Sequence, residues 1–273
     1  MKVKEIPNSI YNTLKLIFKS AVNLKKTDNK VEIPVIISLT SIESRLRTLH
    51  ITVRSLLNQE VKPKKIVLWL NNNLKVNVPT SLKKLEGELF EICYSELTCS
   101  HRKLVHSLVK FPDEIIVTCD DDFIYQKDWM KKLYEEHLIN PEKIIANQTR
   151  YISFNEQRNL LPYKQWRYNK DKPYNEKLIL PIGAGGVLYP INSLANMVTN
   201  QNLFLKLTPK ADDLWFKAMG LLNNTKSILS SKAELPIPLM GTQFESLKKH
   251  NVEEDKNRTQ WQALMDYFEL NLK

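Results

Sequence analysis

The chain has 273 residues, 42% of them hydrophobic, and a formal net charge of +10. This is long enough for one large domain, and the composition is neither that of a disordered chain nor that of a fibrous one. Three cysteines without a CxxC pair argue against a disulfide framework and favour a reducing, cytoplasmic setting. No run of 18 apolar residues occurs, so we expect no membrane-spanning helix.

Residues 1–30 predict a basic amphipathic segment. They carry seven lysines and two acids, which accounts for half of the net charge. Their apolar residues follow helical spacing at Ile10, Leu14, Ile17, Ala21 and Leu24. Such a helix can lie on an anionic membrane surface, with residues 1–28 holding the protein peripherally on the inner face of the plasma membrane. The alternative is that the apolar stripe packs on the main domain, and the sequence leaves both open.

Residues 31–273 predict a single α/β domain with a mostly parallel sheet, because short buried strands alternate with amphipathic helices. We expect strands at 33–39, 65–70, 90–94, 114–119 and 143–147, and helices at 46–57, 104–109 and 127–139. The run Thr40-Ser41-Ile42-Glu43 matches a capping box that would start the first of these helices. Residues 155–178 have no periodicity, so we expect a long loop there.

Three consecutive aspartates, Asp120, Asp121 and Asp122, follow the most apolar of these strands. Like charges this close raise one another's pKa values unless a cation or several donors neutralise them. A hard divalent ion, held by one or two carboxylates and by substrate phosphates, resolves the conflict. The alternative is that one aspartate caps the helix beginning near Lys127 and the other two are solvated.

This strand with its three aspartates resembles the DxD motif of GT-A glycosyltransferases, especially the bacterial family-2-like enzymes. In those enzymes the motif binds a divalent metal and the diphosphate of a nucleotide sugar. The resemblance covers most of residues 32–260 and implies a GT-A fold. It also implies Asp120 and Asp122 as ligands of Mn²⁺ or Mg²⁺, with Asp121 beside the donor. His250 is a candidate third ligand, since some GT-A enzymes recruit a C-terminal histidine; the alternative is a solvated surface histidine.

A second acidic pair, Asp212 and Asp213, is similar to the acidic base motif that these enzymes carry at a helix start. An alcohol is a poor nucleophile at neutral pH, so a positioned carboxylate should take its proton. Asp213 is our candidate base, and Asp212 is the alternative or a supporting partner. Paired acids also favour a helix N-terminus through its dipole, and both uses can hold together.

The resemblance also assigns the donor side. It implies that Thr40 and Ser41 reach the nucleobase and that Asn71 contacts the base or ribose. Arg45 and Lys103 are candidate diphosphate contacts, with ordinary surface charge as the alternative. Glycines 183, 185 and 186 are half of the chain's six, and they resemble a loop beside the donor sugar and acceptor. Their density predicts a close approach of the backbone to a ligand or a positive φ angle, whereas an ordinary turn would need fewer.

The leading hypothesis is therefore a metal-dependent, inverting glycosyltransferase. Its partners are a nucleotide-sugar donor and a glycan or lipid-linked acceptor, as in the synthesis of a bacterial capsule or lipopolysaccharide. Sugar rings can stack on the aromatic residues of 151–174, which can equally cover the core: Tyr151, Tyr163, Trp166, Tyr168 and Tyr174. The alternatives are a metal-dependent nuclease or phosphotransferase and a basic nucleic-acid-binding module. We expect no nucleic-acid partner, because no RNP, zinc-finger or helix-turn-helix signature is present.

Overall fold

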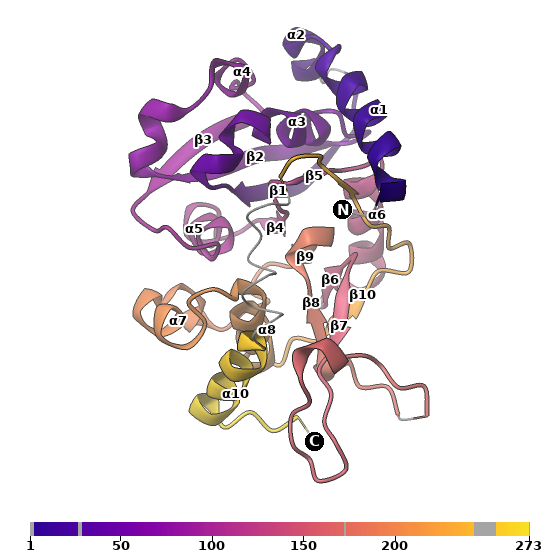
Figure 1. Ribbon diagram of the computed structural model, residues 1–273, viewed down its shortest axis with the longest axis vertical. Coiled ribbons are helices and arrows are strands. Elements are labelled where there is room, and N and C mark those ends of the chain that lie inside the picture. The colour runs from indigo at the N-terminus through magenta and orange to yellow at the C-terminus, as the bar shows by residue number, and fades with distance from the viewer. Residues whose placement is uncertain (1–2, 27–28, 172, 243–254, 273) are drawn as a thin grey trace.

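The computed structural model describes residues 3–26, 29–171, 173–242 and 255–272. Within these residues a seven-stranded sheet forms the centre, in the order β10-β6-β9-β4-β1-β2-β3 (Figure 1). Its strands are β1 (Glu32–Thr40), β2 (Lys62–Asn71), β3 (Phe90–Ser95), β4 (Ile115–Thr118), β6 (Ile144–Ala146), β9 (Val187–Tyr189) and β10 (Ser227–Leu229). Only β9 among them runs antiparallel to its neighbours, β4 and β6. The expected α/β fold with a mostly parallel sheet is confirmed.

Two smaller pairs of strands and several α-helices accompany the central sheet. β5 (Phe123–Ile124) pairs with β11 (Ile237–Pro238), and β7 (Thr149–Tyr151) pairs with β8 (Ile179–Pro181). The longer helices are α1 (Ile6–Ile17), α3 (Leu46–Leu57), α5 (Arg102–Lys110), α6 (Trp129–Ile139), α8 (Asp212–Leu222) and α10 (Lys256–Phe268). The shorter ones are α2 (Ala21–Lys25), α4 (Thr80–Lys83) and α7 (Gln201–Leu207).

Two hydrophobic clusters lie on the two faces of the sheet. Successive side chains of a strand point to opposite faces, so Val35 and Ile37 of β1 belong to one cluster and Ile36 to the other. The first cluster includes buried side chains of α3, α4 and α6. The second includes those of α5, α7, α8 and α10. Burial on both faces explains the nearly continuous apolar runs of β1, β2 and β4.

The parallel strands bring their carboxyl ends to one edge of the sheet. The register pairs Ser38 with Thr118 and Thr40 with Trp69, so the loops after β1, β2 and β4 emerge side by side. Ligands of open α/β sheets bind at such an edge.

The capping box predicted at residues 40–43 is wrong. The hydroxyl of Thr40 donates to the carbonyl of Trp69 at 2.8 Å, and a short 3-10 helix begins at Glu43 without a side-chain cap. Tertiary contacts of Thr40 therefore displace the local capping pattern.

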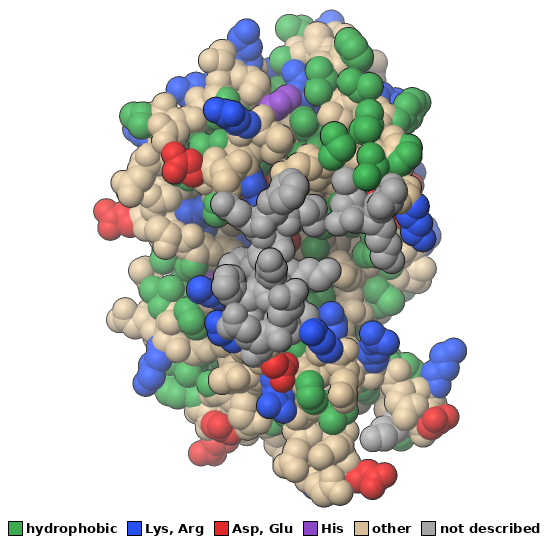
Figure 2. All heavy atoms as spheres, viewed as in Figure 1, with side chains coloured by type: hydrophobic (Ala, Val, Ile, Leu, Met, Phe, Trp, Pro, Cys, Tyr) green, Lys and Arg blue, Asp and Glu red, His purple; other side chains and the backbone are tan. Residues whose placement is uncertain are grey.

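The N-terminal segment forms two helices rather than one. Leu16 and Leu24 are buried, whereas Ile10, Leu14 and Ile17 of the expected stripe are exposed. The expected stripe therefore packs on the main domain at Ala21 and Leu24 only, and it is exposed along α1. Hydrophobic side chains gather over α1 in the space-filling view (Figure 2). None of the helices in the described part of the chain has both the length and the apolar character needed to span a bilayer.

Candidate active site

The middle aspartate of the strand-end triad ties two loops together. The Ser41 hydroxyl donates to Asp121 Oδ2 at 2.5 Å, and Arg45 Nη1 donates to Asp121 Oδ1 at 2.5 Å. Thr52, on α3, donates to the backbone carbonyl of Asp121 at 2.9 Å. Asp121 therefore fixes the loop after β4 against the loop after β1, and it holds its two neighbours at the edge of the sheet.

The two outer aspartates are less completely neutralised. The side chain of Asp120 is 33% exposed, and its Oδ1 accepts from Lys103 Nζ at 2.8 Å. Asp122 Oδ2 lies 3.3 Å from Arg45 Nη2. Burial, together with the charges of Asp120 and Asp121, raises the pKa of Asp122 to about 7. Burial is the larger cause and the neighbouring carboxylates add to it, so a further cation nearby would favour the ionised form of Asp122.

None of the three aspartates caps the following helix. Its N-cap is Asp128, and that residue makes no side-chain capping hydrogen bond. The capping alternative for the triad is therefore excluded.

Around the outer aspartates, the carboxylates outnumber the cations that contact them. Arg45 and Lys103 bring two positive charges to the carboxylates that they contact: Asp120, Asp121, Asp122 and Asp212. In the part of the chain that the structure describes, no three His, Cys, Asp or Glu side chains form a metal cage. The carboxylates of Asp120 and Asp122 would suit Mg²⁺ or Mn²⁺, because a protein can hold these ions through one or two carboxylates together with substrate phosphates. His250 lies outside the described residues.

The second acidic pair stands in the first turn of α8, where the helix dipole favours negative charge. The Ser100 hydroxyl donates to Asp212 Oδ1 at 2.8 Å, and Lys103 Nζ lies 3.1 Å from Asp212 Oδ2. The backbone N–H of Gly183 donates to Asp213 Oδ1 at 3.1 Å. The glycine loop thus orients Asp213 directly.

The pKa values of the two adjacent carboxylates are shifted in opposite directions. Burial opposes the ionisation of both, yet Lys103 and His101 lower the pKa of Asp212 below its ordinary value. Burial and the charge of Asp212 raise the pKa of Asp213 well above its ordinary value. Environments that push two neighbouring pKa values apart are typical of acid–base sites. Asp212 is suited to a fixed ion pair, and Asp213 is suited to accepting a proton.

Lys103 joins the two acidic groups into one site. Its side chain is 5% exposed, and its Nζ bridges Asp120 and Asp212. A Cβ on Gly183 would lie 3.1 Å from Lys103 Nζ, 3.2 Å from Asp213 Oδ1 and 3.4 Å from Asp120 Oδ1. The triad, the acidic pair and the glycine loop therefore converge at Gly183, as the sequence order alone did not reveal.

The other two glycines of the loop are required by packing. A Cβ on Gly185 would lie 2.9 Å from the backbone nitrogen of Gln148. Gly186 has a φ of +95°, and its Cβ would lie 2.4 Å from the ring of Trp129. The expected positive φ and close approach are both present, but the neighbours are protein groups. Contact of Gly185 and Gly186 with a donor stays a prediction.

The candidate nucleobase residues lie at the same edge. Asn71, the last residue of β2, is almost fully buried; its amide donates to the carbonyl of Glu96 at 3.0 Å and its Oδ1 accepts from the N–H of Asn73 at 3.0 Å. These bonds hold the turn that follows β2 against the loop that follows β3. Thr40 and Ser41 stand next to this turn through the pairing of β1 with β2.

Arg102 is a residue of this region that the sequence analysis missed. Its guanidinium donates to the Thr40 hydroxyl, to the Ser41 carbonyl and, at 2.7 Å, to the Leu97 carbonyl. It therefore clamps the end of β1 to the loop after β3. One signal was available: Arg102 and Lys103 open α5, where the helix dipole disfavours positive charge, so tertiary partners are required.

The aromatic residues of the long loop divide into two groups. Tyr163 and Trp166 are buried in the second hydrophobic cluster and cover the core. Tyr151, Tyr168 and Tyr174 form a cluster with ring centroids 5.1–6.0 Å apart, in which Tyr168 and Tyr174 are exposed. Only the second group offers aromatic surface to a ligand.

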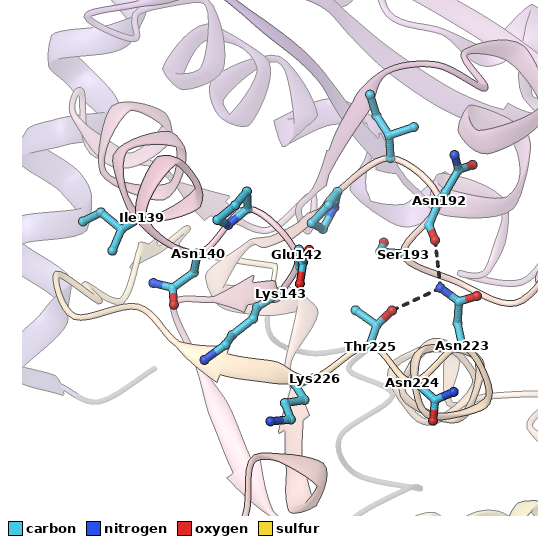
Figure 3. Close-up of a pocket in the computed structure, with 13 residues that line it drawn as sticks. Ile139, Asn140, Glu142, Lys143, Asn192, Ser193, Asn223, Asn224, Thr225 and Lys226 are labelled. Carbon is cyan, nitrogen blue, oxygen red and sulfur yellow. Dashed lines mark hydrogen bonds between the residues drawn. The ribbon is translucent and has the colours of Figure 1, made fainter.

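A pocket of about 640 Å³ lies elsewhere (Figure 3). It is lined by residues that precede β6 and β10 and by residues that follow β9, so it opens at the amino ends of the parallel strands. Asn223 spans part of its wall through hydrogen bonds to Asn192 and Thr225 (Figure 3). This pocket lies at the opposite edge from the aspartates, and we assign the chemistry to the charged cluster instead.

Residues 42–188, just over half of the chain, match the model of Glycosyl transferase family 2. No curated protein matches the sequence.

The chain is also similar, at a low level, to two solved structures. One is a 4-diphosphocytidyl-2C-methyl-D-erythritol synthase from Anaerococcus prevotii, with 14% identity, a TM-score of 0.48 and coverage of 91% of this chain and 99% of that one. The other is residues 1–349 of S. aureus TarS in complex with UDP, with 13% identity, a TM-score of 0.47 and coverage of 74% of this chain and 59% of that one. Similarity at this level says nothing about activity.

Proposed function

The chain belongs to glycosyl transferase family 2, and from this premise we propose that it moves a sugar from a nucleotide-diphosphate donor to an acceptor hydroxyl, with a divalent metal ion and with inversion. One observation carries the proposal: Lys103 Nζ bridges Asp120, at 2.8 Å, and Asp212, at 3.1 Å. A site for the leaving diphosphate and a candidate base are thereby held in one cluster. Sugar transfer needs both groups on opposite sides of one anomeric carbon.

The donor side of the proposed site uses the outer aspartates. Asp120 and Asp122 would hold Mn²⁺ or Mg²⁺ together with the diphosphate, and such an ion neutralises charge that develops on the leaving group. Asp121 positions both aspartates through its bonds to Ser41 and Arg45. The nucleobase would occupy the space beside Thr40, Ser41 and Asn71. Arg102 holds the first two against the loop after β3.

The acceptor side of the proposed site uses Asp213. Its raised pKa makes it a stronger proton acceptor than an ordinary carboxylate. In the proposed step the acceptor O–H proton passes to the Asp213 carboxylate while the acceptor oxygen forms a bond to the anomeric carbon. The bond from that carbon to the diphosphate oxygen breaks on the opposite face, which inverts the anomeric centre. Lys103 keeps Asp212 ionised beside the base without itself entering the reaction.

The proposed acceptor is a hydroxyl of a glycan or of a lipid-linked glycan, in the assembly of a bacterial surface polysaccharide such as capsule or lipopolysaccharide. The exposed rings of Tyr168 and Tyr174 support a carbohydrate acceptor, because aromatic faces pack against the C–H faces of sugars. The same cluster includes Tyr151, whose strand β7 pairs with β8 just before the glycine loop.

A transfer assay tests the proposal. Purified protein with Mn²⁺ and a panel of glycan and lipid-linked glycan acceptors is incubated with UDP-, GDP-, CDP- and dTDP-sugars, and release of the nucleoside diphosphate is followed by chromatography. We expect turnover with one donor class, and loss of that turnover in Asp122→Ala and in Asp213→Ala with unchanged circular dichroism. Product NMR then reads the anomeric configuration. Absence of turnover with every donor would contradict the proposed function. Full activity of Asp213→Ala would contradict the assignment of Asp213 as the base.

A further inference from the structure

One face of α1 and the start of α2 is apolar and exposed. Tyr11, Leu14 and Phe18 are spaced three and four residues apart, and Phe18 is 83% exposed. Ile10, Ile17 and Val22 extend the same surface, and all three are exposed. In Figure 2 hydrophobic side chains gather over the region of α1, in contrast to the mixed surface elsewhere in that view. We call Ile10, Tyr11, Leu14, Ile17, Phe18 and Val22 the α1 surface.

The helix is anchored through its other side, so its apolar surface is held outward. Leu16 is buried in a cluster with Ile51, Ile124 and Leu239. Arg54 of α3 donates to the carbonyl of Leu16, in the last turn of the helix, at 3.1 Å and to that of Lys19, just beyond the helix, at 2.6 Å. These contacts fix the rotation of α1 about its axis. Exposure of the α1 surface is therefore a feature of the packed fold.

Positive charge surrounds the α1 surface. Between Glu5 and Asp28 the sequence has four lysines and no acid. Lys15 lies 5.7 Å from the ring of Tyr11, within the surface itself. Burial and the neighbouring charges of Lys127 and Lys15 lower the pKa of Lys19, which indicates that three cations lie near the end of the helix. An apolar stripe with a cationic margin is typical of helices that lie in the interface of an anionic bilayer.

We propose that the α1 surface docks the protein on an anionic phospholipid bilayer, with the apolar side chains among the acyl chains and the lysines at the headgroups. The same helix contacts β5, which directly follows Asp122, and β11, whose neighbour Leu239 donates its N–H to the Asp122 carbonyl at 2.8 Å. Docking therefore places the bilayer across α1 from the segment that carries the outer aspartates. In this respect the inference rests on the proposed function, since a lipid-linked acceptor would lie in such a bilayer.

Vesicle flotation of the full chain tests the inference. The probes are vesicles of phosphatidylcholine alone and of phosphatidylcholine mixed with phosphatidylglycerol. We expect the protein to float with the anionic vesicles and about tenfold less with the neutral ones. The double variant Leu14→Ser/Phe18→Ser should reduce partition to the anionic vesicles by about tenfold or more. Both side chains are exposed, so circular dichroism and the melting temperature should not change.

The matched control is Leu138→Ser/Ile139→Ser, which removes two exposed apolar side chains from α6. It should leave partition unchanged. Equal partition of the two double variants would overturn the inference, as would light scattering that shows a dimer of the chain lost on substitution of Leu14 and Phe18. Flotation without any use of nucleotide sugars would leave docking standing and remove the proposed function. Sugar transfer to a water-soluble acceptor without flotation would do the reverse.

Discussion

Replacing Lys103 with methionine removes the charge that joins the two acidic groups while it keeps most of the side chain's volume. The ammonium lies 2.8 Å from Asp120 and 3.1 Å from Asp212, and its side chain is only 5% exposed. Removing one partner of a buried ion pair leaves carboxylates without compensation and typically costs about 3–5 kcal/mol. We predict that Lys103→Met lowers the free energy of unfolding by an amount in this range.

Lys132→Met is the matched control. Lys132 also bridges two carboxylates, Asp128 and Glu234, each at 2.8 Å. Its side chain is 25% exposed and those of its partners 38% and 51%, so water screens the pair. Solvent-exposed ion pairs of this kind contribute about 0–1 kcal/mol. Burial, rather than the number or length of the contacts, distinguishes the two variants.

The pH dependence of the free energy of unfolding gives a second test of the Lys103 contacts. The lowered pKa of Asp212 contributes stability above the pKa of the unfolded chain, and this stability is lost as the pH falls through the lower, folded value. Without Lys103 that contribution disappears, so the difference between wild type and variant is largest near neutral pH and narrows in acid. Urea denaturation in EDTA, followed by tryptophan fluorescence, measures it. Equal losses in Lys103→Met and Lys132→Met, at every pH, would refute the buried charge network.

Three further predictions follow from single groups. Asp213→Asn keeps an acceptor for the Gly183 N–H but cannot take a proton, so transfer should fall about 10²–10⁴-fold without loss of melting temperature; near wild-type rates would exclude Asp213 as base. Burial lowers the pKa of Lys217 to about 7, whereas in the unfolded chain its pKa is about 10.5. The unfolded chain therefore binds more protons between these pH values, so the free energy of unfolding should rise with pH there. Lys217→Met should abolish that rise, as measured by urea denaturation. Gly186→Ala must adopt a positive φ and meets the Trp129 ring at 2.4 Å, so it should cost about 2 kcal/mol or more. Gly87→Ala, whose nearest atoms are 3.7 Å away, is its control, and equal melting temperatures of the two variants would contradict this reading.

The sequence predicted the fold best where elements are long. Each strand expected between residues 33 and 119 is present, because β1, β2 and β4 are buried on both faces and read as apolar runs. The strands after β6 have two or three residues, which is too short for any periodicity to appear. The antiparallel insertion of β9 between β4 and β6 depends on the glycine loop that precedes it, and local pattern carries no information about such pairing.

The site shows the same division. The acidic triad and pair stand out in the sequence because charges that follow apolar strands, or that begin a helix, are local signals. Which cation neutralises them depends on tertiary contacts, so Lys103 was expected at a diphosphate but contacts Asp120 and Asp212. The capping pattern at Thr40 failed for the same reason, since Trp69 and Arg102 engage its hydroxyl. The apolar spacing of the N-terminal segment was recognised, but only the packing reveals that Ile10, Leu14 and Ile17 are exposed while Leu24 is buried.

Titration calorimetry of nucleoside diphosphates tests the central claim most directly. UDP, GDP, CDP and dTDP are titrated into wild-type protein and into Asp122→Asn, each with Mn²⁺ and with EDTA. The account predicts that wild type binds at least one of them only with the metal, and that Asp122→Asn weakens this binding by about tenfold or more, as expected for the loss of one of two carboxylate ligands. Equal affinity of the two proteins, or no binding of any diphosphate with Mn²⁺, would contradict it.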